Sequence, residues 1–264
     1  MKNNLKKIYI SLVFIFLYAP IVALAVLSFN DSRTRARWGG FTLRWYGSLF
    51  QSDAIIQALI NTLSIALISA LVATLIGTIA SIAIMRMKKT GRAVTIGITN
   101  IPMLNAEIVT GISLMLLFIS MGIRFGYGTI LLAHITFNIP YVILCIMPKM
   151  RQLDPSTYEA ARYLGASPLY GFVKVVLPEL FPGIVAGFLM AFTLSLDDFI
   201  ITHFTKGAGV HTLSTKIYSE VRKGINPEMY ALSTLIFVSV LVLLILINRL
   251  PARDVYRSKI SKNR

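Results

Sequence analysis

The chain has 264 residues, of which 56% are hydrophobic and only 14% are charged, and its mean hydropathy is +0.72. This balance is far more apolar than that of a soluble globular domain, so the chain must use lipid as its main solvent. A net charge of +15 suits nucleic-acid binding in principle, but the basic residues gather beside apolar segments instead of on one soluble face, which argues against a nucleic-acid partner.

Six long stretches with little or no formal charge follow one another along the chain, each long enough to cross a bilayer core of ~30 Å as a helix. Helices hydrogen-bond their backbone internally and tolerate hydrocarbon, whereas barrel strands would show short alternating segments. The predicted fold class is therefore an all-α membrane protein with six transmembrane helices. The expected spans are Ile8–Phe29, a stretch between Asp53 and Arg86, Ala93–Ile123, a stretch between Arg124 and Lys149, Phe181–Phe204, and Met229–Ile247.

The first apolar segment has two interpretations. A basic start, an apolar run and the small residues of Ala23-Leu24-Ala25 suit a cleavable signal. The run continues over Ile8–Phe29, however, which exceeds the ~7–15 residues of a signal core. We therefore expect a retained transmembrane helix.

The orientation follows from the 26 Lys and Arg residues, because short cytoplasmic loops carry an excess of them. Most lie at the chain start, between the second and third spans, between the fourth and fifth spans, and at the chain end. Both termini are therefore expected in the cytoplasm. The loop after the first span conflicts with this rule, since it would lie outside with Arg33, Arg35, Arg37 and Arg44, but the whole-chain distribution outweighs it.

Two outer segments are expected between the spans. The loop from Asn30 to about Asp53 carries aromatic residues that suit the membrane interface, including Trp38 and Trp45. The segment Lys206–Glu228 is rich in glycine and is expected to be loop with one amphipathic turn.

The cytoplasmic segment from Met150 to Pro182 is expected to form two short helices. Asp154 can cap the first helix and Pro155 suits its first turn, whereas Gly165 can end it in a left-handed conformation. A second helix start follows at Ser167-Pro168. Between Asp154 and Gly165 lies a short helical sequence with small residues beside an acid. Such a helix can dock into a groove of another protein.

This segment also carries a spaced motif. Glu159-Ala160-Ala161, then Gly165, then Val175 and Leu177-Pro178 resemble the EAA signature of ABC-importer permeases. In that family the loop is the coupling helix that inserts into a cleft of the cytoplasmic ATPase, and isoleucine usually stands where this chain has Val175. The resemblance implies the fold of a type I ABC importer permease. It also implies ATPase coupling by Glu159, Ala160, Ala161, Gly165, Leu177 and Pro178.

Further motifs resemble one subfamily, the spermidine/putrescine permeases, over nearly the whole chain, and specifically the second of that importer's two permease subunits. They are Trp38, Gly40-Phe41-Thr42, Trp45-Tyr46, Asn61-Thr62-Leu63, Gly77, Glu107-Ile108-Val109, Ile112-Ser113-Leu114, and Leu194-Ser195-Leu196-Asp197-Asp198-Phe199. The resemblance implies import of polyamines across a bacterial cytoplasmic membrane. It implies three kinds of partner besides lipid, namely a second homologous permease, two cytoplasmic ATPase subunits and an external polyamine-binding protein.

The expected organisation has three parts. Residues 1–56 form the first transmembrane helix and the external aromatic loop, residues 57–249 form the permease core with the coupling loop 150–182, and residues 250–264 form a basic cytoplasmic tail. The chain has no glycine-rich phosphate loop with Lys-Ser/Thr, so ATP is expected to be used by a partner ATPase, with no cofactor bound here.

Three acids inside the predicted spans are the candidate solute path: Glu107, Asp197 and Asp198. Charged side chains in a membrane are costly and usually face a bundle interior or an aqueous path. Counting ~1.5 Å per residue along unbroken helices puts Glu107 and Asp198 at similar levels. On the fifth span, small residues recur every fourth position and allow another helix to approach closely, with Asp198 in the same stripe. The stripe consists of Gly183, Gly187, Ala191 and Ser195.

Alternatives remain for the acids and for the function. The aspartates can instead cap a broken helix, pair with a partner's Lys or Arg, or stay protonated. The same machinery can carry another solute, such as a phosphonate or a ferric complex, and a stand-alone secondary transporter or channel can use the acids as a proton or cation site. An enzyme has no supporting constellation, because His134, His203 and His211 lack metal-ligand spacing and no nucleophile has a base beside it.

Overall fold

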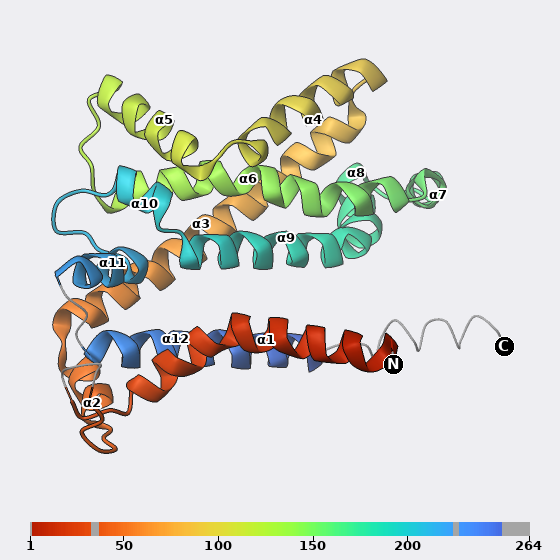
Figure 1. The fold of residues 1–264 in the computed structure, drawn as a ribbon. Helices are drawn as coiled ribbons and strands as arrows, with labels where there is room; N and C mark the ends of the chain where they lie inside the picture. Colours follow the sequence, from red (N-terminus) through yellow and green to blue (C-terminus); the bar gives the residue numbers. More distant parts are fainter. Residues whose placement is uncertain (1, 33–36, 224–226, 250–264) are drawn as a thin grey trace. The chain divides into compact units, whose positions relative to one another are not determined.

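A computed structural model describes residues 2–32, 37–223 and 227–249, and nearly all of them are helical (Figure 1). The all-α fold class is therefore confirmed. The chain divides into two compact units, one of Met1–Ile56 with Ile217–Arg264 and one of Gln57–Lys216. The predicted basic tail 250–264 and the outer-loop residues Arg33 and Arg35 lie outside the described residues.

The first unit contains α1 (Lys2–Leu27), α2 (Arg44–Gln51) and α12 (Pro227–Arg249), and α12 packs against both of the others. The described side chains of α1 are almost all exposed and apolar, as lipid-facing residues would be.

The outer loop of this unit is built around Asn30. The Asn30 side-chain oxygen accepts hydrogen bonds from the Ser32 and Gly39 backbone N–H groups, and its backbone oxygen accepts one from the Trp45 indole at 2.8 Å. Trp45 is buried by these contacts, whereas Trp38 stays exposed. The indole N–H of Trp45 thus finds its partner inside the loop, and the expected position at the membrane interface stays a prediction.

The second unit contains the helices α4 (Lys89–Leu104), α5 (Glu107–Ser120), α6 (Tyr127–Gln152), α7 (Pro155–Tyr163), α8 (Pro168–Gly171), a π-helical turn (Phe172–Val176), α9 (Leu177–Asp197) and α10 (Ile200–Thr205). The long helix α3 (Asp53–Arg86) and α11 (Leu213–Lys223) each run from one unit into the other. The segment Lys206–Glu228 thus holds a helix of 11 residues, more than the single turn expected.

The core of the second unit lies where α6 and α9 run side by side (Figure 1). The predicted stripe of small residues on α9 is buried along its whole length. A Cβ atom on Gly187 would lie 3.2 Å from Val142 Cγ1 of α6, and one on Gly183 would lie 3.0 Å from Lys149 Cγ. The stripe therefore does what the sequence predicts, because only small residues let the two backbones come this close.

Four described helices are long and apolar enough to cross a membrane, and the bent pair α4 and α5 makes a fifth if it is one span. The four are Lys6–Leu27, Asp53–Arg86, Tyr127–Gln152 and Pro168–Asp197. The predicted sixth span forms part of α12, where the side chains at 240 and 243–249 lie outside the described part. The total of six spans stays a prediction.

The third predicted span is not one straight helix. α4 and α5 meet at a bend of 102° and form a V (Figure 1). Pro102 removes a backbone donor from the last turn of α4, and Asn105 and Ala106 then take extended conformations. The expectation of an unbroken helix over Ala93–Ile123 is wrong, and a height counted along it does not apply to Glu107.

Candidate functional site

The fifth predicted span is also interrupted, and the interruption falls at the two adjacent acids. α9 ends at Asp197, Asp198 leaves the helical conformation with ψ 125°, and α10 begins at Ile200. Asp197 is exposed on this chain, whereas only 8% of Asp198 is exposed. Two neighbouring carboxylates thus face different surroundings.

The Asp198 carboxylate caps the start of α10. Oδ1 accepts a hydrogen bond from the Ile201 N–H at 3.2 Å, and Oδ2 accepts from the Thr202 N–H and the Thr202 hydroxyl at 2.8 Å each. The imidazole Nε2 of His134 on α6 lies 3.3 Å from Oδ2. A break in a buried helix leaves backbone N–H groups without acceptors, and the carboxylate oxygens of Asp198 serve as acceptors here.

His134 connects the break to the rest of the unit. Its Nδ1 lies 2.5 Å from Ser195 Oγ in the last turn of α9, and its Nε2 lies 2.9 Å from Thr202 Oγ1 in α10. Ser195 Oγ in turn lies 3.1 Å from Ser69 Oγ of α3. All four side chains are at least 97% buried. The network was not predicted from sequence, although a histidine within an apolar span was a signal that could have pointed to it.

Two further contacts fix the same region. The Thr129 hydroxyl at the start of α6 donates to the Thr205 carbonyl at the end of α10, at 2.7 Å. The Ser214 hydroxyl of α11 donates to the Asp198 carbonyl, also at 2.7 Å. The break is therefore a well-bonded structural feature.

Glu107 lies at the other helix interruption, in the first turn of α5, and its side chain is exposed. α5 packs directly on α10, since a Cβ on Gly111 would lie 3.1 Å from Phe204 Cδ2. No hydrogen bond or ion pair joins Glu107 to Asp197 or Asp198 among the described residues. The structure thus brings the helices of the three acids together without joining their carboxylates.

The coupling segment follows its prediction closely. Asp154 caps α7 by accepting from the Ser156 N–H at 3.0 Å, and this bond, with a further one from the Ser156 side chain, lowers the pKa of the Asp154 carboxyl. Gly165 has φ +87°, and its N–H donates to the Arg162 carbonyl while the Ala166 N–H donates to the Ala161 carbonyl. This is a Schellman end, for which glycine is favoured.

The second half of the motif lies in a helix instead of a loop. Ser167 caps α8 by accepting from the Tyr170 N–H at 3.2 Å, and helical structure continues through the π-turn into α9. Leu177 and Pro178 stand in the first turn of α9, directly after the π-helical turn.

The tip of the coupling segment presents apolar side chains. Tyr163 is 91% exposed and Leu164 is 89% exposed, and they follow the exposed Glu159 and Ala160. Sequence reasoning singled out the small residues and the acid but not these two. Adjacent exposed apolar side chains form a surface that another protein can cover.

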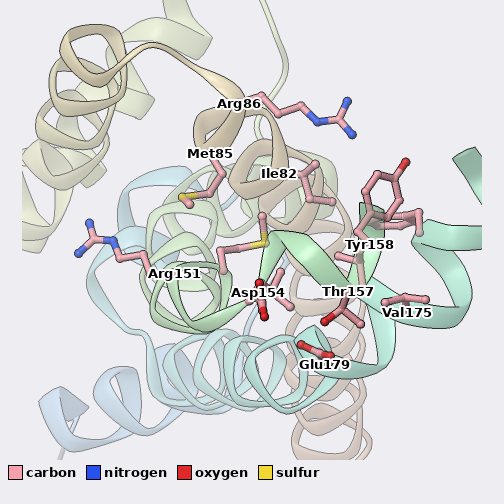
Figure 2. A pocket seen from close by; sticks show the side chains of 13 residues that line it. Ile82, Met85, Arg86, Arg151, Asp154, Thr157, Tyr158, Val175 and Glu179 are labelled. Carbon is pink, nitrogen blue, oxygen red and sulfur yellow. The ribbon is translucent and has the colours of Figure 1, made fainter. Parts of the chain in front are cut away.

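A cavity of about 620 Å³ lies beside α7, between the ends of α3 and α6 and the start of α9 (Figure 2). Its lining is mostly apolar and includes Ile82 and Met85. Figure 2 shows Asp154 and Glu179 together on one side, whereas the guanidinium group of Arg86 points away. The coupling segment is therefore not packed tightly against α3.

The three histidines belong to no cluster of potential metal ligands in the described part of the chain. Among residues 2–32, 37–223 and 227–249, no group of three or more His, Cys, Asp and Glu side chains is placed to hold a metal ion.

The chain is similar in sequence to known transport permeases. The chain is 38% identical to the spermidine/putrescine transport system permease protein PotC of Escherichia coli (strain K12) over 246 residues, 93% of each chain. It is 41% identical to the putrescine transport system permease protein PotI of the same strain, over 84% of this chain and 82% of that relative.

A solved structure has the same fold. In a bacterial alginate ABC transporter in complex with an alginate pentasaccharide-bound periplasmic protein, one chain matches with a TM-score of 0.66 and 16% identity, covering 96% of this chain and 94% of that chain. The profile of the family described as binding-protein-dependent transport system inner membrane component matches residues 73–255. The chain therefore belongs to the family of inner membrane components of binding-protein-dependent transport systems, the ABC importer permeases.

Proposed function

We propose that this chain is a permease subunit of an ATP-driven importer that carries spermidine, putrescine or both across the bacterial cytoplasmic membrane. The observation that supports it most is the 38% identity over 93% of the chain to a spermidine/putrescine permease. The exposed acids at two helix interruptions agree with a cationic solute, because a polyamine that loses hydration needs negative charge nearby.

In this proposal Glu107, Asp197 and Asp198 belong to the solute path with different tasks. Asp197 and Glu107 are exposed on this chain and offer carboxylates to the polycation. Asp198 uses its carboxylate oxygens within the chain and holds the break that presents Asp197. The break is the point at which movement of α9 would alter the path.

The proposed coupling surface contains Glu159, Ala160, Ala161 and Gly165 of the motif, together with Tyr163 and Leu164. These residues would enter a cleft of an ATPase subunit, as the EAA resemblance implies. The cavity beside α7 leaves room for this segment to shift when the ATPases close. Leu177 and Pro178 would then transmit the shift, because they begin the helix that ends at Asp197.

The proposed assembly contains a second homologous permease, two cytoplasmic ATPase subunits and an external polyamine-binding protein, with ATP bound only by the ATPases. Both termini of this chain would lie in the cytoplasm. The proposed division has residues 1–56 as first helix and outer loop, 57–249 as permease core with the coupling loop 150–182, and 250–264 as basic tail.

Uptake by the reconstituted complex tests this function. Vesicles that hold both permeases and the ATPases, supplied with the binding protein and ATP, should accumulate radiolabelled putrescine or spermidine. If a complex that hydrolyses ATP takes up neither polyamine, the proposed substrate is refuted and another solute is favoured. Polyamine uptake by this chain alone, without an ATPase, would instead favour a secondary transporter.

A further inference from the structure

One side chain contacts both sides of the break between α9 and α10. His134 reaches Ser195 with one ring nitrogen and Thr202 with the other, so the last turn of α9 and the first turn of α10 share one partner from α6. Ser195 and Thr202 are seven positions apart in sequence and belong to different helices. The backbone alone does not fix the angle between those helices at such a break.

The direction of the hydrogen bonds shows how the ring is held. The Thr202 hydroxyl donates its single proton to Asp198 Oδ2 at 2.8 Å. Thr202 Oγ1 must then accept, so the proton between it and the ring belongs to His134 Nε2. The same N–H lies 3.3 Å from Asp198 Oδ2. The ring therefore has a defined orientation, with its Nε2 edge toward the cap and its Nδ1 edge toward α9.

Removal of the imidazole would take one hydrogen-bond partner from each of several buried groups. Among the described residues, the Asp198 carboxylate would lose its one donor from another helix, and the Ser195 hydroxyl would keep only Ser69 as a side-chain partner. Buried polar groups that lose a partner recover it by moving, since an unsatisfied group in a low-dielectric interior is costly. The residue that moves with the break is Asp197, which directly precedes the cap.

We propose that His134 is a positioning residue of the solute path, which clamps α9 to α10 through Ser195, Thr202 and Asp198 and thereby sets the position of Asp197. This inference rests on the proposed function, in which Asp197 faces the solute. His134 itself is buried and does not touch the solute. Its effect is on the rate at which solute passes, and the ATPase contact lies in a separate segment.

The test compares His134→Ala, His134→Gln and Thr136→Ala in the complete reconstituted complex. Thr136 is the matched control, because it is exposed on the same helix and, within the described part of the chain, its hydroxyl bonds only to the Leu132 carbonyl of that helix. For His134→Ala we expect the maximal uptake rate to fall about tenfold or more while ATP hydrolysis stays within about twofold, so that more ATP is used per solute. His134→Gln, which keeps an N–H donor, should recover part of the rate, and Thr136→Ala should match the wild type.

Each other outcome has a defined meaning. Uptake by His134→Ala within about twofold of the wild type overturns the clamp. A proportional fall in uptake and ATP hydrolysis also overturns it, because that pattern reports general damage. If the complex with His134→Ala fails to assemble, Ser195→Ala and Thr202→Val test the proposal instead, since each removes one of the two hydroxyl partners of the His134 ring. Each is expected to raise the ATP used per solute, and unchanged ratios in both would overturn the proposal.

A measurement without solute separates this inference from the proposed function. In a Cys145→Ala background, Asp197→Cys is labelled with a cationic methanethiosulfonate, with and without His134→Ala. A change in labelling rate of about fivefold or more supports the clamp even where the wild type imports no polyamine. Equal labelling rates overturn the clamp even where polyamine import is normal.

Discussion

The coupling segment and the break between α9 and α10 differ in what holds them. In the coupling segment, each stabilising bond joins residues at most five positions apart, such as Asp154 to Ser156 and Ala166 to Ala161. At the break, His134 bonds residues 61 and 68 positions away. Local bonds leave a segment free to move as one piece, whereas bonds from other helices hold a break in one position.

The largest effect is expected from Glu159→Lys. This change reverses the charge at the exposed start of the coupling surface and should abolish uptake, while the chain still inserts and pairs with its partner permease. Uptake per assembled complex is the measurement, with Glu159→Gln as a control that keeps the side-chain size. Normal uptake in the lysine variant would refute the coupling role.

A change in the α9 stripe should damage the fold itself. A Cβ added to Gly187 would lie 3.2 Å from Val142 Cγ1, so Gly187→Leu should force α6 and α9 apart and sharply reduce the amount of folded complex. Gly187→Ala should cost about 1–3 kcal/mol. Gly97→Ala is the matched control, because nothing lies within 4 Å of its Cβ. A stable Gly187→Leu complex would contradict the close packing.

The end of α7 should be sensitive to a smaller change. Gly165 has φ +87°, a conformation that costs a side chain about 1 kcal/mol or more, so Gly165→Ala should loosen the coupling tip. We expect a several-fold loss of uptake with normal assembly. Gly91→Ala, at an open position of α4, should have no such effect. Equal uptake in both variants would show that the tip needs no fixed end.

The smallest effect should be a pH dependence of the α7 cap. Because the folded-state pKa of Asp154 is lowered, its capping contribution is present above the ordinary carboxyl pKa and is lost as the pH falls through the folded value. Asp154→Asn accepts the same bond at every pH, so it should remove this acid dependence. Hydrogen exchange of α7 against pH, in wild type and variant, is the measurement, and identical profiles would contradict the role of the carboxylate.

The sequence allowed the coupling segment to be predicted well for a physical reason. Asp154, Pro155, Gly165 and Ser167 act on neighbours in the chain, and their preferences are local. The stripe on α9 was predicted equally well, because a four-residue spacing places Gly183 and Gly187 on one helix face.

The helix interruptions could not be predicted in the same way. Pro102 lies inside a run that otherwise reads as one span, and a proline marks a bend without giving its angle. At Asp198 the deciding partners are His134 and Ser214, which sequence spacing does not bring together. The capping role was one of several alternatives for the two aspartates, and only the contacts separate Asp198 from Asp197.

The most direct test of the different tasks of these two acids is a side-by-side comparison of Asp197→Asn and Asp198→Asn in the complete complex. Polyamine uptake per assembled complex and the amount of complex are measured together. Asp197→Asn should assemble normally and lose uptake, whereas Asp198→Asn, which weakens the cap and its bond to His134, should reduce the amount of assembled complex. The assignment would be contradicted if Asp198→Asn assembled normally but lost uptake while Asp197→Asn kept normal uptake. Asp198 would then be the carboxylate that meets the solute.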